Sequence, residues 1–181
     1  ARWNELSDQP LIMSINLSRC QLKLKLCCTI ANLLEEHGIA PTQVALEITE
    51  SAVIHNYNEG KQCLENLKKQ ELELYLDDFG TGFSSLSQLQ DLPITTVKLD
   101  KSFVQAGTSG SNAIIAATQA ICDKLQLKLV AEGVETMEQL EYLQVRGFDF
   151  AQGYLLNKPI SVQEIEAMKF DVLNVNCLKG A

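Results

Sequence analysis

Residues 72–100, LELYLDDFGTGFSSLSQLQDLPITTVKLD, contain two short β-rich runs separated by a glycine-rich turn and a short helical segment. The runs are 72–77 and 95–100, and the helical segment between them ends before Pro93. A strand, a crossover helix and a second strand within about 30 residues form the usual unit of a parallel β-sheet. This stretch therefore predicts an α/β fold with a parallel sheet.

The same alternation runs along the whole chain. Strands are predicted at 11–17, 44–49, 72–77, 95–100, 127–131 and 148–151. Helices are predicted after a capping box at Ser18 and Gln21, at 59–70, before Pro93, after a Gly/Ser loop at 107–111, and after capping boxes at Thr136–Gln139 and Ser161–Glu164. The sequence thus predicts one domain of six β/α units over 1–169, followed by a tail at 170–181. Because a closed (β/α)₈ barrel needs eight strands, either the sheet is open or two strands of a barrel are missing.

The composition excludes several classes of protein. The 181 residues are 46% hydrophobic and 21% charged, which is enough apolar material for a core and argues against intrinsic disorder. The net charge of −8 argues against binding to a nucleic acid polymer, and no apolar stretch is long enough for a membrane contact or span. The six cysteines form no C-x-x-C pair, so we expect buried, reduced thiols. Reduced thiols favour a cytoplasmic location, and the chain could be the cytoplasmic portion of a larger, membrane-attached protein.

Polar side chains follow or interrupt each of the six predicted strands, where parallel strands carry functional groups. These residues are Asn16, Glu47, Glu50, Asp77, Asp78, Lys98, Asp100, Glu132, Glu135 and Gln152. Each one alone could be a loop, turn or surface residue. Their presence at all six strand ends is harder to explain by turn chemistry, so we expect a functional site.

The residue types in this set indicate a metal site. Several carboxylates in one cluster repel each other unless some are protonated or cations lie between them. Carboxylate and amide oxygens without His or Cys suit Mg²⁺ or Mn²⁺, and two such ions can clamp a phosphodiester for in-line attack. A neighbouring lysine could hold water or offset charge on the phosphoryl oxygens. The residues thus favour metal-dependent hydrolysis of a phosphoester.

Several segments resemble the EAL-domain family of phosphodiesterases, which hydrolyse the bacterial messenger cyclic di-GMP. They are 14–18 (SINLS), 46–52 (LEITESA), 77–86 (DDFGTGFSSL), 97–104 (VKLDKSFV), 130–136 (VAEGVET), and 152–154 (QGY) with 158–159 (KP). The matches occur in the family's order and cover nearly the whole chain. The resemblance implies a (β/α)₈ TIM-barrel-like fold and hydrolysis of cyclic di-GMP to linear pGpG with two Mg²⁺ or Mn²⁺ ions. It also implies a homodimer or an upstream sensory or GGDEF-type domain as a partner.

The resemblance implies a role for each matching residue. The implied ligands of the ions are Asn16, Glu47, Asp77, Asp78 and Glu132. Lys98 and Glu132 are the implied catalytic residues, with Lys98 positioning the hydrolytic water. Substrate or outer-shell contacts are implied for Glu50, Asp100, Glu135 and Gln152. Glu50 is also implied to steady the loop that begins with Gly80, Thr81 and Gly82 and to influence dimer contacts.

The chain departs from the family in one respect, because it contains no Glu-Ala-Leu segment. In the family this segment lies on an early strand and its glutamate is a metal ligand. We therefore expect an incomplete barrel of about six β/α units in which the first two strands are missing. The two bare sheet edges would then be covered by a longer polypeptide or by self-association. The alternative function is a catalytically inactive EAL-like regulator that binds cyclic di-GMP or a protein partner.

Overall fold

The structure is a computed structural model that describes residues 11–54, 57–82 and 86–167. Six strands form one sheet in the order β1-β2-β3-β4-β5-β6. They are β1 (Met13–Leu17), β2 (Val44–Thr49), β3 (Glu73–Phe79), β4 (Thr96–Leu99), β5 (Lys128–Ala131) and β6 (Phe150–Ala151). Within the described residues β1 and β6 are the two edges, so this sheet is not closed. Six strands in one α/β sheet confirm the predicted fold class.

The helices lie between and after the strands. They are α1 (Lys25–Glu36), the short 3₁₀ helix η2 (Pro41–Gln43), α2 (Glu50–Ile54), α3 (Tyr57–Lys68), α4 (Leu86–Asp91), α5 (Lys101–Ala106), α6 (Ser109–Leu125), α7 (Met137–Val145) and α8 (Val162–Ala167). The chain divides within β4 into two compact units, the first ending at Val97 and the second beginning at Lys98.

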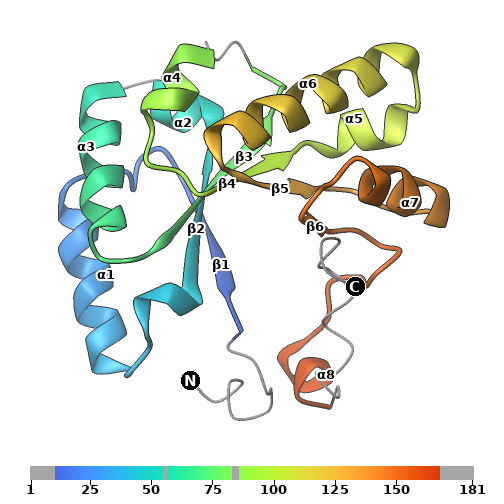
Figure 1. The fold of residues 1–181 in the computed structure, drawn as a ribbon. Coiled ribbons are helices and arrows are strands. Elements are labelled where there is room, and N and C mark those ends of the chain that lie inside the picture. Colours follow the sequence, from blue (N-terminus) through green and yellow to red (C-terminus); the bar gives the residue numbers. More distant parts are fainter. Residues whose placement is uncertain (1–10, 55–56, 83–85, 168–181) are drawn as a thin grey trace. The chain divides into compact units, whose positions relative to one another are not determined.

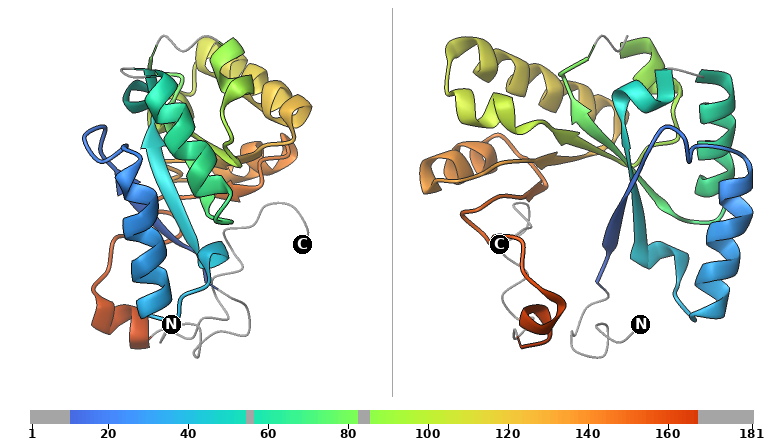
Figure 2. Two further views of the ribbon diagram at one scale, coloured as in Figure 1. Left: turned by 90° about the vertical axis from the view of Figure 1, so that its left-hand side faces the viewer. Right: turned by 180° about the vertical axis from the view of Figure 1, so that it is seen from behind.

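The core of the first unit lies between its strands and the helices α1 and α3. Strands β1, β2 and β3 are parallel, and Leu46 pairs with Leu74 while Ile48 pairs with Leu76. Figures 1 and 2 show α1 and α3 side by side on the same face of these strands. All four of these paired side chains are at most 3% exposed. Burying one leucine or isoleucine contributes about 1.5–3 kcal/mol, so this layer is a large part of the unit's stability.

Two buried thiols join α1 to α3. The Sγ atoms of Cys27 and Cys63 lie 4.0 Å apart, and the Cys63 thiol also donates to the Lys23 carbonyl at 3.2 Å. Burial, together with the nearby Cys27 thiol, raises the pKa of Cys63 to about 12. Cys63 therefore stays protonated at neutral pH and behaves as a small apolar residue.

The expectation of buried thiols is right for Cys27, Cys63 and Cys122 and wrong for Cys20 and Cys28, which are exposed. Cys28 lies one position past the buried Cys27 on α1, so its side chain points about 100° away from the stripe that faces the core. Cys177 lies outside the described residues.

In the second unit, the helix starts follow the capping pattern. Thr136 and Gln139 form the predicted capping box at α7, and the Ser161 backbone N–H donates to Glu164 at 2.7 Å before α8. An unpredicted capping box of Thr108 and Ser111 begins α6. Strands β5 and β6 are parallel, and Phe148, Leu129 and Leu143 are at most 2% exposed between them and the helices.

Two local predictions were wrong, and two helices, α2 and α5, were missed. The Ser18–Gln21 hydrogen bonds form, but they close a turn before α1, which begins at Lys25 without a side-chain cap. The predicted loop at 107–111 ends earlier, because Thr108 already caps α6. Helix α5 was not predicted; its N-cap is Asp100, which accepts a hydrogen bond from the Ser102 N–H at 3.0 Å. The predicted tail at 170–181 lies outside the described residues.

Among the residues that the structure describes, no helix is both long enough and apolar enough to cross a membrane.

Candidate metal and catalytic site

The register of the first unit places several predicted residues on one face of the sheet. Asn16 pairs with Glu47, Glu47 pairs with Tyr75, and Thr49 pairs with Asp77. Side chains alternate along a strand, and the leucines at the intervening positions pack toward α1 and α3. Asn16, Glu47 and Asp77 therefore lie on the face opposite those helices. Tyr75 shares this face and was not predicted as a site residue, because its alternation with leucines looks like that of any half-buried strand.

Three carboxylates of this unit are wholly or partly removed from water. Glu47 is 7% exposed, and Asp77 and Asp78 are half-buried. One carboxylate oxygen of Asp77 and one of Asp78 lie within 4.8 Å of each other. Two negative charges at this separation in a poorly solvated place repel strongly, and a cation between them would remove the repulsion. The pair therefore fits a divalent ion.

An unusual backbone conformation brings these two neighbouring carboxylates together. Consecutive residues of a regular strand point to opposite faces, but Asp78 has a φ of 56°, in the left-handed region. Asp78 also begins a tight turn, in which the Thr81 N–H and hydroxyl donate to its carbonyl at 3.3 and 2.8 Å. Aspartate is one of the few residues that adopt this conformation at modest cost. The strand therefore ends in a way that breaks the alternation and pairs the two side chains.

Glu50 connects the end of β2 to the loop after β3. It is the first residue of α2 and only 5% exposed. Gly82 packs directly against it, because a Cβ atom built on Gly82 would lie 3.0 Å from the Glu50 Oε1. Of the predicted loop, residues 83–85 lie outside the described residues.

In the second unit, Lys98 and Glu132 form an ion pair at the ends of β4 and β5. The Lys98 Nζ lies 2.6 Å from the Glu132 Oε1, and the two side chains are 5% and 17% exposed. The Glu132 N–H donates to the Leu99 carbonyl at 3.2 Å, which holds its backbone against β4. A buried charge is tolerated when its partner is at hydrogen-bond distance. This pair is a positive and a negative charge fixed side by side.

Two glycines fix the backbone after Glu132. Gly133 has a φ of +67°, and a Cβ atom added there would lie 2.4 Å from the Cβ of Lys101 on α5. A Cβ atom on Gly153 would lie 2.1 Å from the Val134 carbonyl oxygen. Such approaches are possible only without a side chain. The segment that carries Glu132 is therefore held from two sides.

Gln105 makes two contacts that no sequence pattern predicts. Its Nε2 donates to the Glu135 Oε1 at 2.9 Å and to the Gly133 carbonyl at 3.4 Å. A lone glutamine on an unpredicted helix, 30 residues away from Glu135, carries no recognisable pattern.

Substituting the glycine beside Glu132 tests how tightly this segment is packed. Gly133→Ala is expected to lower the free energy of unfolding by about 3 kcal/mol, from backbone strain and from overpacking against α5. The control is Gly107→Ala, because Gly107 has a similar φ of +59° but open space around it. The control should cost about 1 kcal/mol, from strain alone. Urea unfolding followed by circular dichroism gives both values, and equal losses would contradict the close contact with Lys101.

The remaining two predicted residues are placed by backbone and capping interactions. The Asp100 side chain caps α5, which gives it a structural task. Gln152 follows β6 and is exposed; its N–H donates to the Ala131 carbonyl at 2.8 Å, and its carbonyl accepts from the Val134 N–H at 3.0 Å.

The six-stranded sheet and the carboxylates at the end of β3 define an α/β domain with a carboxylate cluster at a strand end. The profile of the EAL domain family matches residues 1–159. The chain therefore belongs to the EAL domain family.

Three matches to known proteins illustrate the similarity. The chain is 37% identical over 170 residues to the bifunctional diguanylate cyclase/cyclic di-GMP phosphodiesterase MucR of Pseudomonas aeruginosa, covering 92% of this chain and 24% of MucR. It matches the solved PaMucR phosphodiesterase in complex with c-di-GMP with a TM-score of 0.86 and 35% identity, covering 91% of this chain and 68% of that one. It matches the manganese and cyclic di-GMP complex of Klebsiella pneumoniae BlrP1 with a TM-score of 0.79 and 31% identity, covering 87% of this chain and 41% of that one.

Proposed function

We propose that this chain is the larger part of an EAL domain that hydrolyses cyclic di-GMP to linear pGpG. The observation that carries the proposal is the pair of close carboxylates, Asp77 and Asp78, at the end of β3. The matched MucR and BlrP1 structures contain cyclic di-GMP, which supports this substrate. The chain spans only 24% of the length of MucR. We therefore also propose, rather than conclude, the activity of any longer protein that contains this chain.

The proposed cofactor is Mg²⁺ or Mn²⁺, two ions to a complete site. The residues that would hold the ions are Asn16, Glu47, Asp77, Asp78 and Glu132. All five offer oxygen atoms, the ligands that these hard cations prefer, and the manganese complex of BlrP1 is a precedent in a relative. When bound, the ions would polarise the scissile phosphate and lower the pKa of a water molecule.

The other charged groups suit the hydrolysis of a phosphodiester. The Lys98 ammonium is fixed at 2.6 Å from Glu132, so it can orient a water molecule toward the phosphorus. Its positive charge would also offset negative charge that builds up on the phosphoryl oxygens. Glu50, packed against Gly82, would hold the loop at 80–82 in place. We also propose that three further residues contact either the substrate or the groups that surround the metal ligands: Asp100, Glu135 and Gln152.

The boundaries of the domain are also a proposal: an EAL-like part at 1–169 and a tail at 170–181. Residues Met13 and Ile15 of the edge strand β1 are 46% and 49% exposed. An edge strand with exposed apolar side chains is suited to pairing with a further strand. The two strands that the family carries before this point, including Glu-Ala-Leu, would complete the barrel there.

The proposed partners and location follow from the same relatives and from the thiols. MucR is named as a bifunctional diguanylate cyclase and phosphodiesterase, which supports an upstream GGDEF-type or sensory domain; a homodimer is the other proposed partnership. Cys27 and Cys63 are free thiols 4.0 Å apart, which favours a reducing compartment such as the cytoplasm.

The second candidate function is an inactive regulator that binds cyclic di-GMP or a protein partner. Membership of the EAL domain family does not by itself establish turnover, so the regulator is kept as the alternative. The five oxygen-bearing residues proposed as ligands and Lys98 are all present in this chain, which favours the enzyme.

The two candidates are separated by measuring turnover. Hydrolysis of cyclic di-GMP with Mn²⁺ is followed for this chain and for the same chain extended at its N-terminus by the Glu-Ala-Leu segment of an EAL relative. The enzyme proposal expects pGpG from the extended chain. If neither chain makes pGpG while both bind cyclic di-GMP, the regulator is correct.

A further inference from the structure

A pocket of about 340 Å³ lies in the first unit, between the turn after β1 and the helices α2 and α3. Its apolar part is formed by Leu22 and Ala52, which are 6% and 7% exposed, and by the buried Gly60 on α3. A Cβ atom built on Gly60 would lie 3.2 Å from the Leu22 Cδ2, so the turn packs closely against α3. The volume is in the range of small-molecule sites.

Hydrogen bonds fix the turn at 18–23 that forms one side of this pocket. The Ser18 N–H donates to the Gln21 Oε1 at 3.0 Å, and the Gln21 N–H donates to the Ser18 carbonyl at 2.9 Å. The Cys63 thiol on α3 donates to the Lys23 carbonyl at 3.2 Å, which ties the end of the turn to that helix. The side chains that the turn presents to the pocket therefore start from a fixed backbone.

Four side chains at the edge of the pocket carry charge or a reactive group. Arg19 and Lys23 are cations, Glu59 is an anion and Cys20 is a free thiol, and all four are exposed to solvent. A ligand that complements all of them carries two negative charges, one positive charge and a sulfur atom. A carboxylate has several acceptor positions, so Glu59 can bind an ammonium group in addition to the contact that it already makes.

Exposure alone does not make a thiol a binding site, as a second cysteine of the same unit shows. Cys28 on α1 is also free and exposed, but it is not among the residues that line the pocket. Cys20 differs from Cys28 because it has a cavity beside it and charges of both signs around that cavity.

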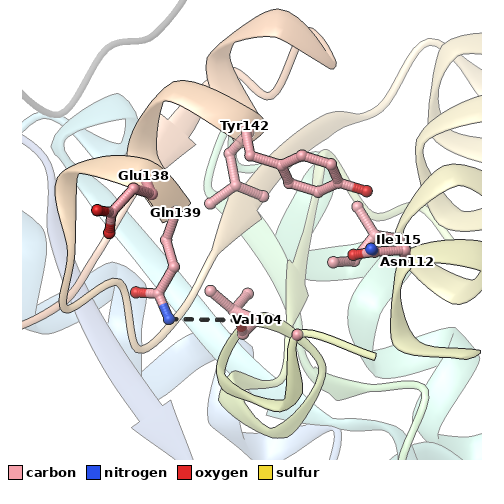
Figure 3. A pocket seen from close by; sticks show the side chains of 8 residues that line it. Val104, Asn112, Ile115, Glu138, Gln139 and Tyr142 are labelled. Carbon is pink, nitrogen blue, oxygen red and sulfur yellow. Dashed lines mark hydrogen bonds between the residues drawn. The ribbon is translucent and has the colours of Figure 1, made fainter. Parts of the chain in front are cut away.

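The pocket between α5, α6 and α7 in the second unit has a different character. Figure 3 shows the Gln139 amide directed at Val104, whose carbonyl accepts a hydrogen bond from it at 3.4 Å. The described residues that line this pocket are mostly apolar and include neither a cation nor a thiol. It therefore does not select a ligand by charge, as the pocket in the first unit does.

We propose that the pocket beside the turn at 18–23 binds a small peptide thiol with two carboxylates and one ammonium group, the chemistry of glutathione, and that Cys20 forms a mixed disulfide with it. Arg19 and Lys23 bind the two carboxylates, and Glu59 binds the ammonium group. The peptide part of the ligand lies over the apolar part of the pocket. This site is separate from the proposed metal and catalytic site and does not depend on the proposed hydrolysis.

The covalent bond forms by exchange between Cys20 and the disulfide form of the ligand. The Cys20 sulfur attacks as a thiolate, the disulfide bond of the ligand breaks, and a new disulfide joins Cys20 to one half of the ligand. The other half leaves as a thiolate and takes up the proton that Cys20 released. Cys20 is oxidised and the departing half is reduced, so no further oxidant is needed. Exchange with the reduced ligand removes the modification again.

Peptide mapping by mass spectrometry of the whole chain, treated with glutathione disulfide, compares two exposed thiols within one molecule. Cys20 is expected to gain glutathione at least about tenfold faster than Cys28, because two or three ion pairs hold the ligand beside it. Cystamine is the control disulfide, since it carries an ammonium group on each half and no carboxylate. It should show no preference for Cys20, because Arg19 and Lys23 repel it.

Variants of the charged residues locate the contacts. Arg19→Gln and Lys23→Gln should each slow the reaction of Cys20 with glutathione disulfide about two- to fivefold, the effect of losing one exposed ion pair. The matched control is Lys25→Gln, because Lys25 is exposed at the start of α1 and does not line the pocket. This control should leave the rate at Cys20 unchanged.

Glu59→Gln separates a specific contact from general electrostatic repulsion. The proposal expects this variant to react more slowly at Cys20, because the ammonium group of the ligand loses its partner. If Glu59 only repelled an anionic disulfide, the variant would react faster, and this result would overturn the proposal. The proposal is also overturned if Cys28 gains glutathione as fast as Cys20, or if cystamine shows the same preference for Cys20, since exposure alone would then explain the reaction.

Discussion

Asp77→Asn is expected to abolish cyclic di-GMP hydrolysis in the N-terminally extended chain, with a loss of more than about 10³-fold in kcat. The substitution keeps the size and shape of the side chain and removes one of two carboxylates whose oxygens lie within 4.8 Å of each other. With half of that charge gone, the attraction for a divalent ion falls steeply. We therefore also expect Mn²⁺ to stop raising the thermal unfolding temperature, because a ligand stabilises a protein only as far as it binds the folded state.

The matched control is Asp91→Asn, which removes the same charge from an exposed carboxylate at the end of α4, in the same unit. This variant should keep both its turnover and its response to Mn²⁺. In the absence of the ion, Asp77→Asn should be at least as stable as the unmodified chain, because the repulsion from Asp78 is gone. Turnover by Asp77→Asn within about tenfold of the unmodified enzyme would contradict the proposed metal site.

The strands were predictable because their signal is local. Residues 44–49 are mostly apolar, and residues 72–77 alternate between leucine and polar or aromatic residues. The structure has β2 and β3 at these positions, with β3 extended to Phe79. Asp77 and Asp78 look like turn residues in the sequence, yet both lie in β3, which continues past the left-handed φ of Asp78 to Phe79.

The helix starts show where a local pattern can mislead. Thr136 with Gln139 and Ser18 with Gln21 have the same spacing, but only the first pair forms both bonds of a capping box. The Ser18 N–H donates to the Gln21 Oε1, whereas the Gln21 N–H donates to the Ser18 carbonyl and not to its hydroxyl. Only the first pair begins a helix directly. After Ser18 the chain makes a further turn, in which the Lys23 N–H donates to the Gln21 carbonyl at 2.8 Å, before α1 begins. The spacing alone therefore indicates a bend, and only the complete pair of bonds at Thr136 and Gln139 marks the start of a helix.

Within the candidate site, the residue types were predictable and several contacts were not. The chemistry of Asp77, Lys98 and Glu132 follows from their charges and their positions at strand ends. The 2.6 Å ion pair of Lys98 with Glu132 and the backbone contact at Gly133 depend on residues that lie more than 30 positions apart. A single sequence does not encode such distances, because they arise only when β4, the end of β5 and α5 pack together.

Lys98→Met is expected to separate water positioning from metal binding in the extended chain. Methionine matches the length of the lysine stem and fits a position that is 4% exposed, but it lacks the charge that would orient water and offset charge on the phosphate. We expect kcat to fall by about 10²-fold or more. The response to Mn²⁺ should be the opposite of that in Asp77→Asn. Because Glu132 loses the ammonium at 2.6 Å, its carboxylate has one competing partner fewer, so Mn²⁺ should raise the unfolding temperature at least as much as in the unmodified chain.

When no ion is present, Lys98→Met should lower the free energy of unfolding, because the partly buried Glu132 carboxylate loses the ammonium beside it. Breaking a fully buried ion pair costs about 3–5 kcal/mol. We expect a smaller loss here, because the Glu132 side chain is 17% exposed. Lys124→Met, on the last turn of α6, removes a lysine outside the site and serves as the matched control, with unchanged turnover expected. Thermal unfolding with and without Mn²⁺, together with pGpG production, distinguishes the outcomes. If Lys98→Met loses the response to Mn²⁺ along with its turnover, the lysine supports the metal site as a whole, and the separate water-positioning role is wrong.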